Sequence, residues 1–207
     1  MLVAALLVAS LAQDPGIVLV EAESFADTGG WVVDQQFMDL MGSPMLLAHG
    51  LGVPVKDAAT EVAFPAAGDY RVFVRTRDWV APWQAPGAPG RFELLIDGAT
   101  LPTTFGVEGA EWHWQPGGTV TVGERARLAL HDLTGFDGRC DAILFARDPA
   151  FVPTDDGDEL AELRARLHGF GAAPADGGRF DLAVVGGGLA GTAAAITAAR
   201  LGLAVVL

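Results

Sequence analysis

The sequence predicts a mainly β protein: an antiparallel β-sandwich of the jelly-roll kind, followed by an incomplete α/β unit of the Rossmann βαβ type. The sandwich is predicted by many short apolar segments separated by turn residues, with no long helical pattern among them. The second unit is predicted by an apolar run that leads directly into a glycine-rich turn near the end of the chain. The expected boundaries are 17–148 for the sandwich, 149–179 for a helix with a flexible linker, and 180–207 for the start of the second unit.

Length and composition limit the classes of protein to consider. The chain has 207 residues, which allows one full domain and a remainder. Hydrophobic residues make up 51% and charged residues 19%, as in a folded globular protein. The net charge of −13 and the absence of a Lys/Arg cluster exclude a nucleic-acid partner. Because Cys140 is the single cysteine, no disulfide forms within the chain.

The first residues resemble a secretory signal peptide. Residues 1–12 are apolar and end in Ser10-Leu11-Ala12, which matches an apolar region followed by a small-residue cleavage site. This pattern predicts cleavage after Ala12 and a secreted or periplasmic location. Because the segment has no Lys or Arg at its start, a buried first strand or a misassigned start codon are the alternatives. The segment is too short to span a bilayer, and no transmembrane span is expected.

The strands of the sandwich are predicted from apolar alternation and from β-branched and aromatic content. In the clearest case Tyr70, Val72 and Val74 alternate with their neighbours, which is typical of a half-buried strand. Asp97-Gly98 is a turn between two apolar runs. The predicted strands are Ile17–Glu23, Glu61–Phe64, Tyr70–Asp78, Arg91–Asp97, Thr119–Val122, Arg127–Asp132 and Ala142–Arg147.

The connector between the two units is predicted to begin with a short amphipathic helix. Leu160, Leu163 and Leu167 lie on one face at helical spacing, and Thr154 or Asp155 precedes them as a cap. A glycine- and alanine-rich stretch follows the helix, as in a flexible joint. The pattern favours a spacer over a functional site.

The glycine motif near the end of the chain predicts a dinucleotide site. Gly186 allows a tight turn, Gly188 lets the backbone approach a pyrophosphate, and Gly191 lets the helix pack on the strand. The free N–H groups of Leu189 and Ala190 would face the anion. The acidic residue that binds the ribose is expected about 20 residues further on, and the sequence ends before reaching it. We therefore expect the 207 residues alone to bind no dinucleotide tightly and to be inactive.

Three carboxylates at the two ends of the sandwich predict a structural calcium site. Glu21, Glu23 and Asp141 supply hard oxygen ligands, which Ca²⁺ prefers. Here the sequence resembles carbohydrate-binding modules of the β-jelly-roll, galactose-binding-like type, families six and thirty-five. In those modules an opening Glu-Ala-Glu and an Asp on the final strand hold calcium. In the alternative interpretation the carboxylates face solvent or pair with arginines such as Arg139 and Arg71.

Two further features are candidates for binding. The stretch from 130 to 143 is rich in polar groups, but it contains no nucleophile-and-base pairing, so it is interpreted as structural. The tryptophans Trp79 and Trp83 lie in a Pro/Gly-rich loop, where exposed indoles would suit stacking on sugar rings. At least three of the five tryptophans are expected in the core.

Taken together, the chain resembles the amino-terminal part of a bacterial FAD-dependent oxidoreductase of the xanthan-lyase-like type. The resemblance rests on Phe180–Ala195, on Trp31–Phe37 and on Asp132–Ala142. It implies FAD as cofactor and hydride transfer to the flavin, with unknown catalytic residues beyond Leu207. Two alternatives stay open: a non-catalytic carbohydrate-binding module with a glycan as partner, and an NAD-dependent dehydrogenase.

Overall fold

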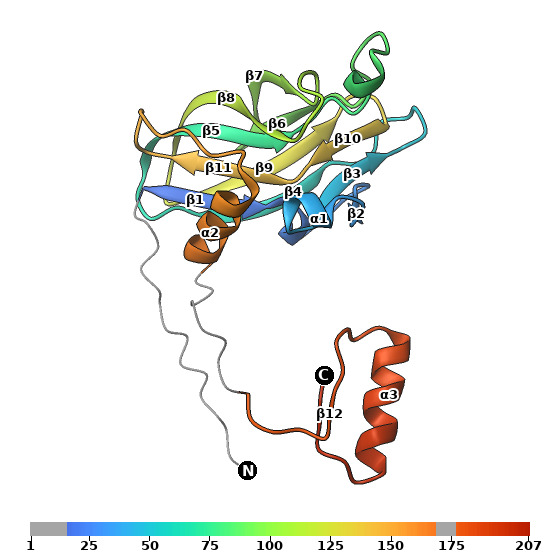
Figure 1. The fold of residues 1–207 in the computed structure, drawn as a ribbon. Coiled ribbons are helices and arrows are strands. Elements are labelled where there is room, and N and C mark those ends of the chain that lie inside the picture. The colour runs from blue at the N-terminus through green and yellow to red at the C-terminus, as the bar shows by residue number, and fades with distance from the viewer. Residues whose placement is uncertain (1–15, 169–176) are drawn as a thin grey trace. The chain divides into compact units, whose positions relative to one another are not determined.

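A computed structural model describes residues 16–168 and 177–207 (Figure 1). The chain divides into two compact units, Met1–Phe170 and Gly171–Leu207. The predicted signal peptide, 1–12, and the central part of the predicted linker lie outside the described residues. Each unit is described by itself below.

The first unit is an antiparallel β-sandwich, as predicted. One four-stranded sheet has the order β1 (Ile17–Glu21), β11 (Ala142–Ala146), β5 (Gly68–Thr76) and β8 (His113–Val122). The other has the order β4 (Ala58–Ala63), β9 (Arg125–Asp132), β6 (Phe92–Ile96) and β7 (Ala99–Phe105). A three-stranded sheet has the order β10 (Phe136–Cys140), β3 (Met45–His49) and β2 (Val32–Asp34).

The core lies between the two larger sheets. Val72 and Phe145 of the first sheet pack in one cluster with Phe92 and Leu128 of the second. Along each strand the core residues recur at every second position, as Tyr70, Val72 and Val74 do in β5, so they point to the same side of the sheet. Burying this apolar cluster is the main force that holds the two sheets together.

The short helix α2 (Gly157–Leu167) covers the outer face of the first sheet (Figure 1). Leu160 and Leu163 are buried against Phe73, Trp114 and Leu144. This contact explains why every residue of β11 is buried, and why β5 is buried on both faces and not half-buried as predicted. The helix was predicted correctly, but its interpretation as a spacer is wrong, because it is part of the packed domain.

The cap of α2 and the ends of several strands differ from the prediction. Asp156, one residue beyond the predicted Asp155, accepts hydrogen bonds from the N–H groups of the first turn of the helix. The first strand ends at Glu21, and a 3₁₀ turn, η1 (Ala22–Ser24), carries Glu23. Four strands were missed, β2, β3, β7 and β10, and β8 begins six residues before the predicted Thr119, at His113.

The second unit has the predicted strand–helix–strand order. The strands β12 (Leu182–Ala183) and β13 (Val205–Val206) pair in parallel, and α3 (Leu189–Arg200) connects them. A side chain on Gly191 would meet the Gly186 carbonyl oxygen at 1.9 Å, so only glycine fits there. Each strand has only two residues, and this pair is much smaller than the multi-stranded sheet of a complete nucleotide-binding fold.

Candidate functional site

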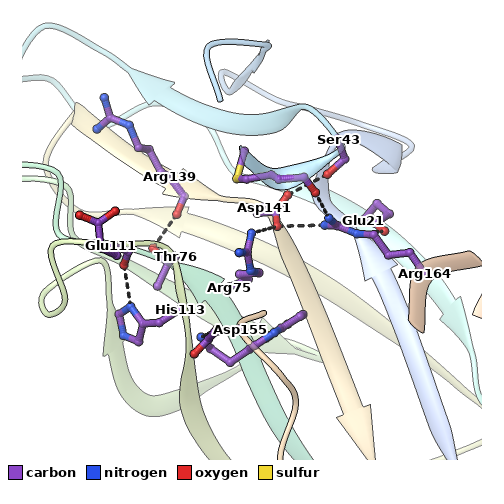
Figure 2. Close-up of polar contacts among 12 residues, drawn as sticks. Glu21, Ser43, Arg75, Thr76, Glu111, His113, Arg139, Asp141, Asp155 and Arg164 are labelled. Atoms are coloured by element: carbon purple, nitrogen blue, oxygen red, sulfur yellow. Dashed lines mark hydrogen bonds and ion pairs between the residues drawn. The ribbon is translucent and has the colours of Figure 1, made fainter. Parts of the chain in front are cut away.

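A buried ionic network connects the start of the sandwich, its last strand and α2 (Figure 2). Asp141 directly precedes β11 and is fully buried. Its carboxylate accepts hydrogen bonds from Arg75 Nη1 at 2.9 Å and from Arg164 Nη2 at 2.9 Å. Ser43 Oγ donates a third, at 3.0 Å. All the oxygens of this buried charge are therefore compensated by protein groups.

Arg164 of α2 is the centre of the network. Its Nε and Nη2 donate to the two oxygens of Glu21 at 2.8 and 3.0 Å, and its Nη1 donates to the carbonyl of Met41. His168 Nε2 lies 3.0 Å from Glu21 Oε1. Hydrogen bonds from His168 and Arg164 oppose the effect of burial, and the pKa of Glu21 is held below its usual range. Burial raises the pKa of Asp141, against the effect of the two arginines.

The arginine side chain therefore lies where the sequence predicted calcium. Glu21 and Asp141 share Arg164, and among the described residues no group of three or more His, Cys, Asp or Glu side chains has a metal-holding arrangement. Glu23 is on η1 and does not share a strand face with Glu21, as had been expected. The alternative, pairing with arginines, describes the structure better, although the partners are Arg75 and Arg164 and not Arg71 and Arg139.

A pocket of about 490 Å³ opens beside this network, between η1, the segment 41–44 and α2. Glu23, Arg164 and His168 contribute its polar lining. Glu23 Oε2 is buried without a hydrogen-bond partner among the described residues. Burial is the main cause that raises the pKa of Glu23 to about 7, and the nearby carboxylates Glu21 and Asp141 add to it. At neutral pH a substantial fraction of Glu23 is therefore protonated.

Aromatic side chains gather at one end of the sandwich, in the loop around η2 (Ala81–Trp83) and at the start of β10. Trp83 is 70% exposed and Phe136 is 50% exposed. Trp79 donates from Nε1 to the Phe136 carbonyl at 3.0 Å, and its ring meets that of Trp83 edge to face at 6.3 Å. The guanidinium of Arg139 lies over Trp79, 5.2 Å from the ring centre. We call Trp79, Trp83 and Phe136 the aromatic surface.

Asp132 fixes the loops next to the aromatic surface. This buried carboxylate accepts hydrogen bonds from the backbone N–H groups of Val55, Thr134 and Gly135 at 2.9 to 3.1 Å. It therefore ties the segment before β4 to the segment before β10. The structural interpretation of the polar stretch 130–143 is in accord with this role, because its acidic groups serve hydrogen bonding and ion pairing.

The tryptophans divide as predicted from the sequence. Trp31, Trp112 and Trp114 are at most 7% exposed and pack in three different clusters. The two indoles of the 112–114 stretch therefore do not form a binding face. Trp79 and Trp83, from the Pro/Gly-rich loop, are the two that lie outside the core.

Comparison with known proteins gives structural similarity alone. No family model and no curated protein matches the chain. It is similar to a mannanase of Podospora anserina, a GH26-CBM35 protein, with 16% identity over 67% of this chain and 29% of that one, at a TM-score of 0.49. A family 35 carbohydrate-binding module of Clostridium thermocellum has 16% identity over 62% of this chain and 98% of its own, at 0.47. The carboxy-terminal family 6 module of a laminarinase of Zobellia galactanivorans has 17% identity over 63% and 99%, at 0.43.

These comparisons overturn the prediction of an FAD-dependent oxidoreductase. The similar solved structures are carbohydrate-binding modules and carbohydrate-active enzymes, and none of the three is a flavin-dependent enzyme. The interpretation of the chain as part of a redox enzyme that uses FAD or NAD is therefore wrong.

The glycine motif itself is not tested by these comparisons. Gly186 has a positive φ of 104°, as its predicted tight turn requires, while Val185 and Leu189 on either side are almost fully exposed. A role of Gly186, Gly188, Leu189, Ala190 and Gly191 in cofactor binding stays a prediction. Among the described residues, no helix has the length and apolar composition needed to cross a bilayer.

Proposed function

We propose that the sandwich is a non-catalytic carbohydrate-binding module, and that the aromatic surface is its sugar-binding site. The observation that supports this most directly is the exposure of Trp83, 70%, on a loop whose neighbouring side chains are fixed. Apolar side chains that are exposed together on a folded domain mark an interaction site, and Trp83 lies beside Trp79 and Phe136. An indole face suits the apolar face of a sugar ring.

The geometry of the loop favours a preformed site. Trp79 is held from three sides, by the hydrogen bond to the Phe136 carbonyl, by Arg139 and by Trp83. Gly90 lies against the Trp79 ring, and a Cβ at that position would come within 2.9 Å of it. Little side-chain freedom is lost when a ligand binds to rings that are already fixed, which increases affinity.

The proposal also gives a reason for the predicted export. A module that recognises polysaccharide works where polysaccharide is found, outside the cytoplasm or at the cell surface. The predicted signal peptide at 1–12 is consistent with a secreted or periplasmic location, and detection of the intact Met1 in an exported fraction would contradict the cleavage.

Binding of the 207-residue chain to a panel of polysaccharides tests the proposal, by glycan array and by affinity electrophoresis. We expect binding to at least one polysaccharide, and we expect Trp83→Ala to weaken it by about 2 kcal/mol or more, as for a central aromatic contact. Val152→Ala is the matched control, because Val152 is 73% exposed and lies on the segment before α2. Absence of binding to every polysaccharide of the panel, or binding by Trp83→Ala as tight as that of the unchanged chain, would refute the proposal.

A further inference from the structure

Four arginines of the sandwich are more than nine-tenths buried, and they differ in what compensates their charge. Arg75 and Arg164 both form ion pairs with Asp141 at 2.9 Å. Arg77 and Arg139, each 9% exposed, form no ion pair with any described residue. Burying a charge without a counter-ion is costly, so the second pair of arginines requires an explanation.

The second pair keeps its hydrogen-bonding capacity largely free. The Nε of each guanidinium is enclosed and has no partner. Arg139 Nη1 donates to the Asp137 carbonyl at 2.8 Å, whereas Arg77 makes no hydrogen bond within the described part of the chain. In each guanidinium, Nε is the one buried nitrogen without a hydrogen-bond partner among the described residues. The terminal nitrogens that have no partner therefore reach solvent. Figure 2 shows the guanidinium of Arg139 pointing away from the carboxylates around Arg164.

The backbones that carry the two arginines are joined by a hydrogen bond, because Thr76, the residue before Arg77, donates from Oγ1 to the Arg139 carbonyl at 2.6 Å. Arg139 also contacts the aromatic surface through Trp79. Burial lowers the pKa of Arg139, and the positive charge of Arg77 lowers it further. The carboxylates of Asp137 and Asp34 act in the opposite direction, but neither forms an ion pair with Arg139. Arg77 lies over Phe37, 5.5 Å from the ring centre, and Arg139 lies over Trp79. Stacking holds both guanidinium planes in place while their outer edges stay available.

We propose that Arg77 and Arg139 form an anion-binding subsite of the carbohydrate-binding surface, and that the ligand is a saccharide bearing carboxylate or sulfate groups. This inference rests on the proposed function above. A guanidinium edge matches two oxygens of such a group and binds it with paired, charge-assisted hydrogen bonds. The net charge of −13 repels polyanions in general, so a preference for an acidic saccharide requires a local positive group such as this pair.

The test compares saccharides that differ in charge alone. Polygalacturonate is paired with its methyl-esterified form and dextran sulfate with dextran, and each is measured with the 207-residue chain at fixed ionic strength. We expect at least one acidic polymer to bind about tenfold more tightly than its neutral twin, which corresponds to about 1.4 kcal/mol. The first pair reports on carboxylate and the second on sulfate.

Variants separate the subsite from the stacking surface. We expect Arg77→Met and Arg139→Met to remove the preference for the acidic polymer, while Trp83→Ala weakens binding to both members of a pair. Arg125→Met, at an exposed position, removes the same charge and keeps the preference. Because burial of a charge without an ion-pair partner is costly, and because Met keeps most of the apolar length of the side chain, we expect the melting temperatures of the two subsite variants to stay level or rise.

The possible results distinguish the two proposals. Equal binding of charged and neutral twins, or a preference that survives in both subsite variants, would overturn the anion subsite and leave the glycan proposal standing. A preference lost equally in Arg125→Met would also overturn it, because total charge would then be the cause. Absence of binding to every polysaccharide would overturn the proposed function and the subsite with it.

Discussion

Replacing Arg164 by Met tests whether the ionic network holds α2 on the sandwich. The substitution leaves the fully buried carboxylate of Asp141 with Arg75 and Ser43 alone, and it removes both guanidinium contacts of Glu21. Removing one partner of a buried ion pair costs about 3–5 kcal/mol. For a domain of this size the melting temperature falls by about 2–4 °C per kcal/mol, which gives a decrease of about 6–20 °C.

The assay is urea unfolding followed by tryptophan fluorescence, which suits this domain because Trp114 packs in the same cluster as α2. Arg166→Met is the control, since it makes the same change at an exposed position of the same helix. A double-mutant cycle with Glu21→Gln measures the coupling, which we expect to be about 0.5–3 kcal/mol. A coupling near zero, or a loss below about 1 kcal/mol for Arg164→Met, would show that apolar packing alone holds the helix.

Two further predictions concern single carboxylates. The raised pKa of Glu23, about 7 against 4.5 for the free group, means that its contribution to stability is present below pH 4.5 and is lost as pH rises through 7. The melting temperature of Glu23→Gln is therefore expected to fall less between pH 4.5 and 7 than that of the unchanged protein. Glu162→Gln, at an exposed position of α2, is the control and is expected to leave this fall unchanged. An equal fall in both variants would refute the raised pKa of Glu23. Asp132→Asn removes an acceptor of charge-assisted hydrogen bonds and is expected to lower the free energy of unfolding by about 1.5–3 kcal/mol in urea titrations. Exposed Asp39→Asn is its control, and a loss of equal size in both variants would contradict the role given to Asp132.

The strands that were predicted and those that were missed differ in local pattern. Apolar alternation identified β5, β6 and β9, whose inward residues form the core. The missed β10 begins Phe136-Asp-Gly, which is typical of a turn. In the structure Asp137 has a positive φ of 58° and the register with β3 shifts between Phe136 and Gly138, so the Asp-Gly pair forms a bulge inside a strand. Local residue preference does not distinguish a bulge from a turn, because the partner strand decides between them.

The acidic half of the ionic network was identified from the sequence, and its basic half was not. Glu21 and Asp141 attract attention because they stand at the two ends of apolar strands. Arg164 lies 143 positions after Glu21. Its spacing from Leu160 places it on the apolar face of α2, but the sequence does not show which carboxylates that face meets. Only the docking of Leu160 and Leu163 on the sheet brings its guanidinium to the carboxylates.

Arg75 and Arg77 show most clearly what the fold adds to the sequence. Arg75 is in β5, and Arg77 directly follows Thr76, the last residue of that strand. The two have the same side chain, and both are almost fully buried. Arg75 faces Asp141, while Arg77 lies over Phe37 with no ion pair in the described part of the chain. A fold retains a buried charge when something compensates it, and for Arg75 that partner is internal. For Arg77 and Arg139 no ion pair with a described residue supplies this compensation, and the position of Arg139 over Trp79 of the aromatic surface favours a ligand that carries negative charge.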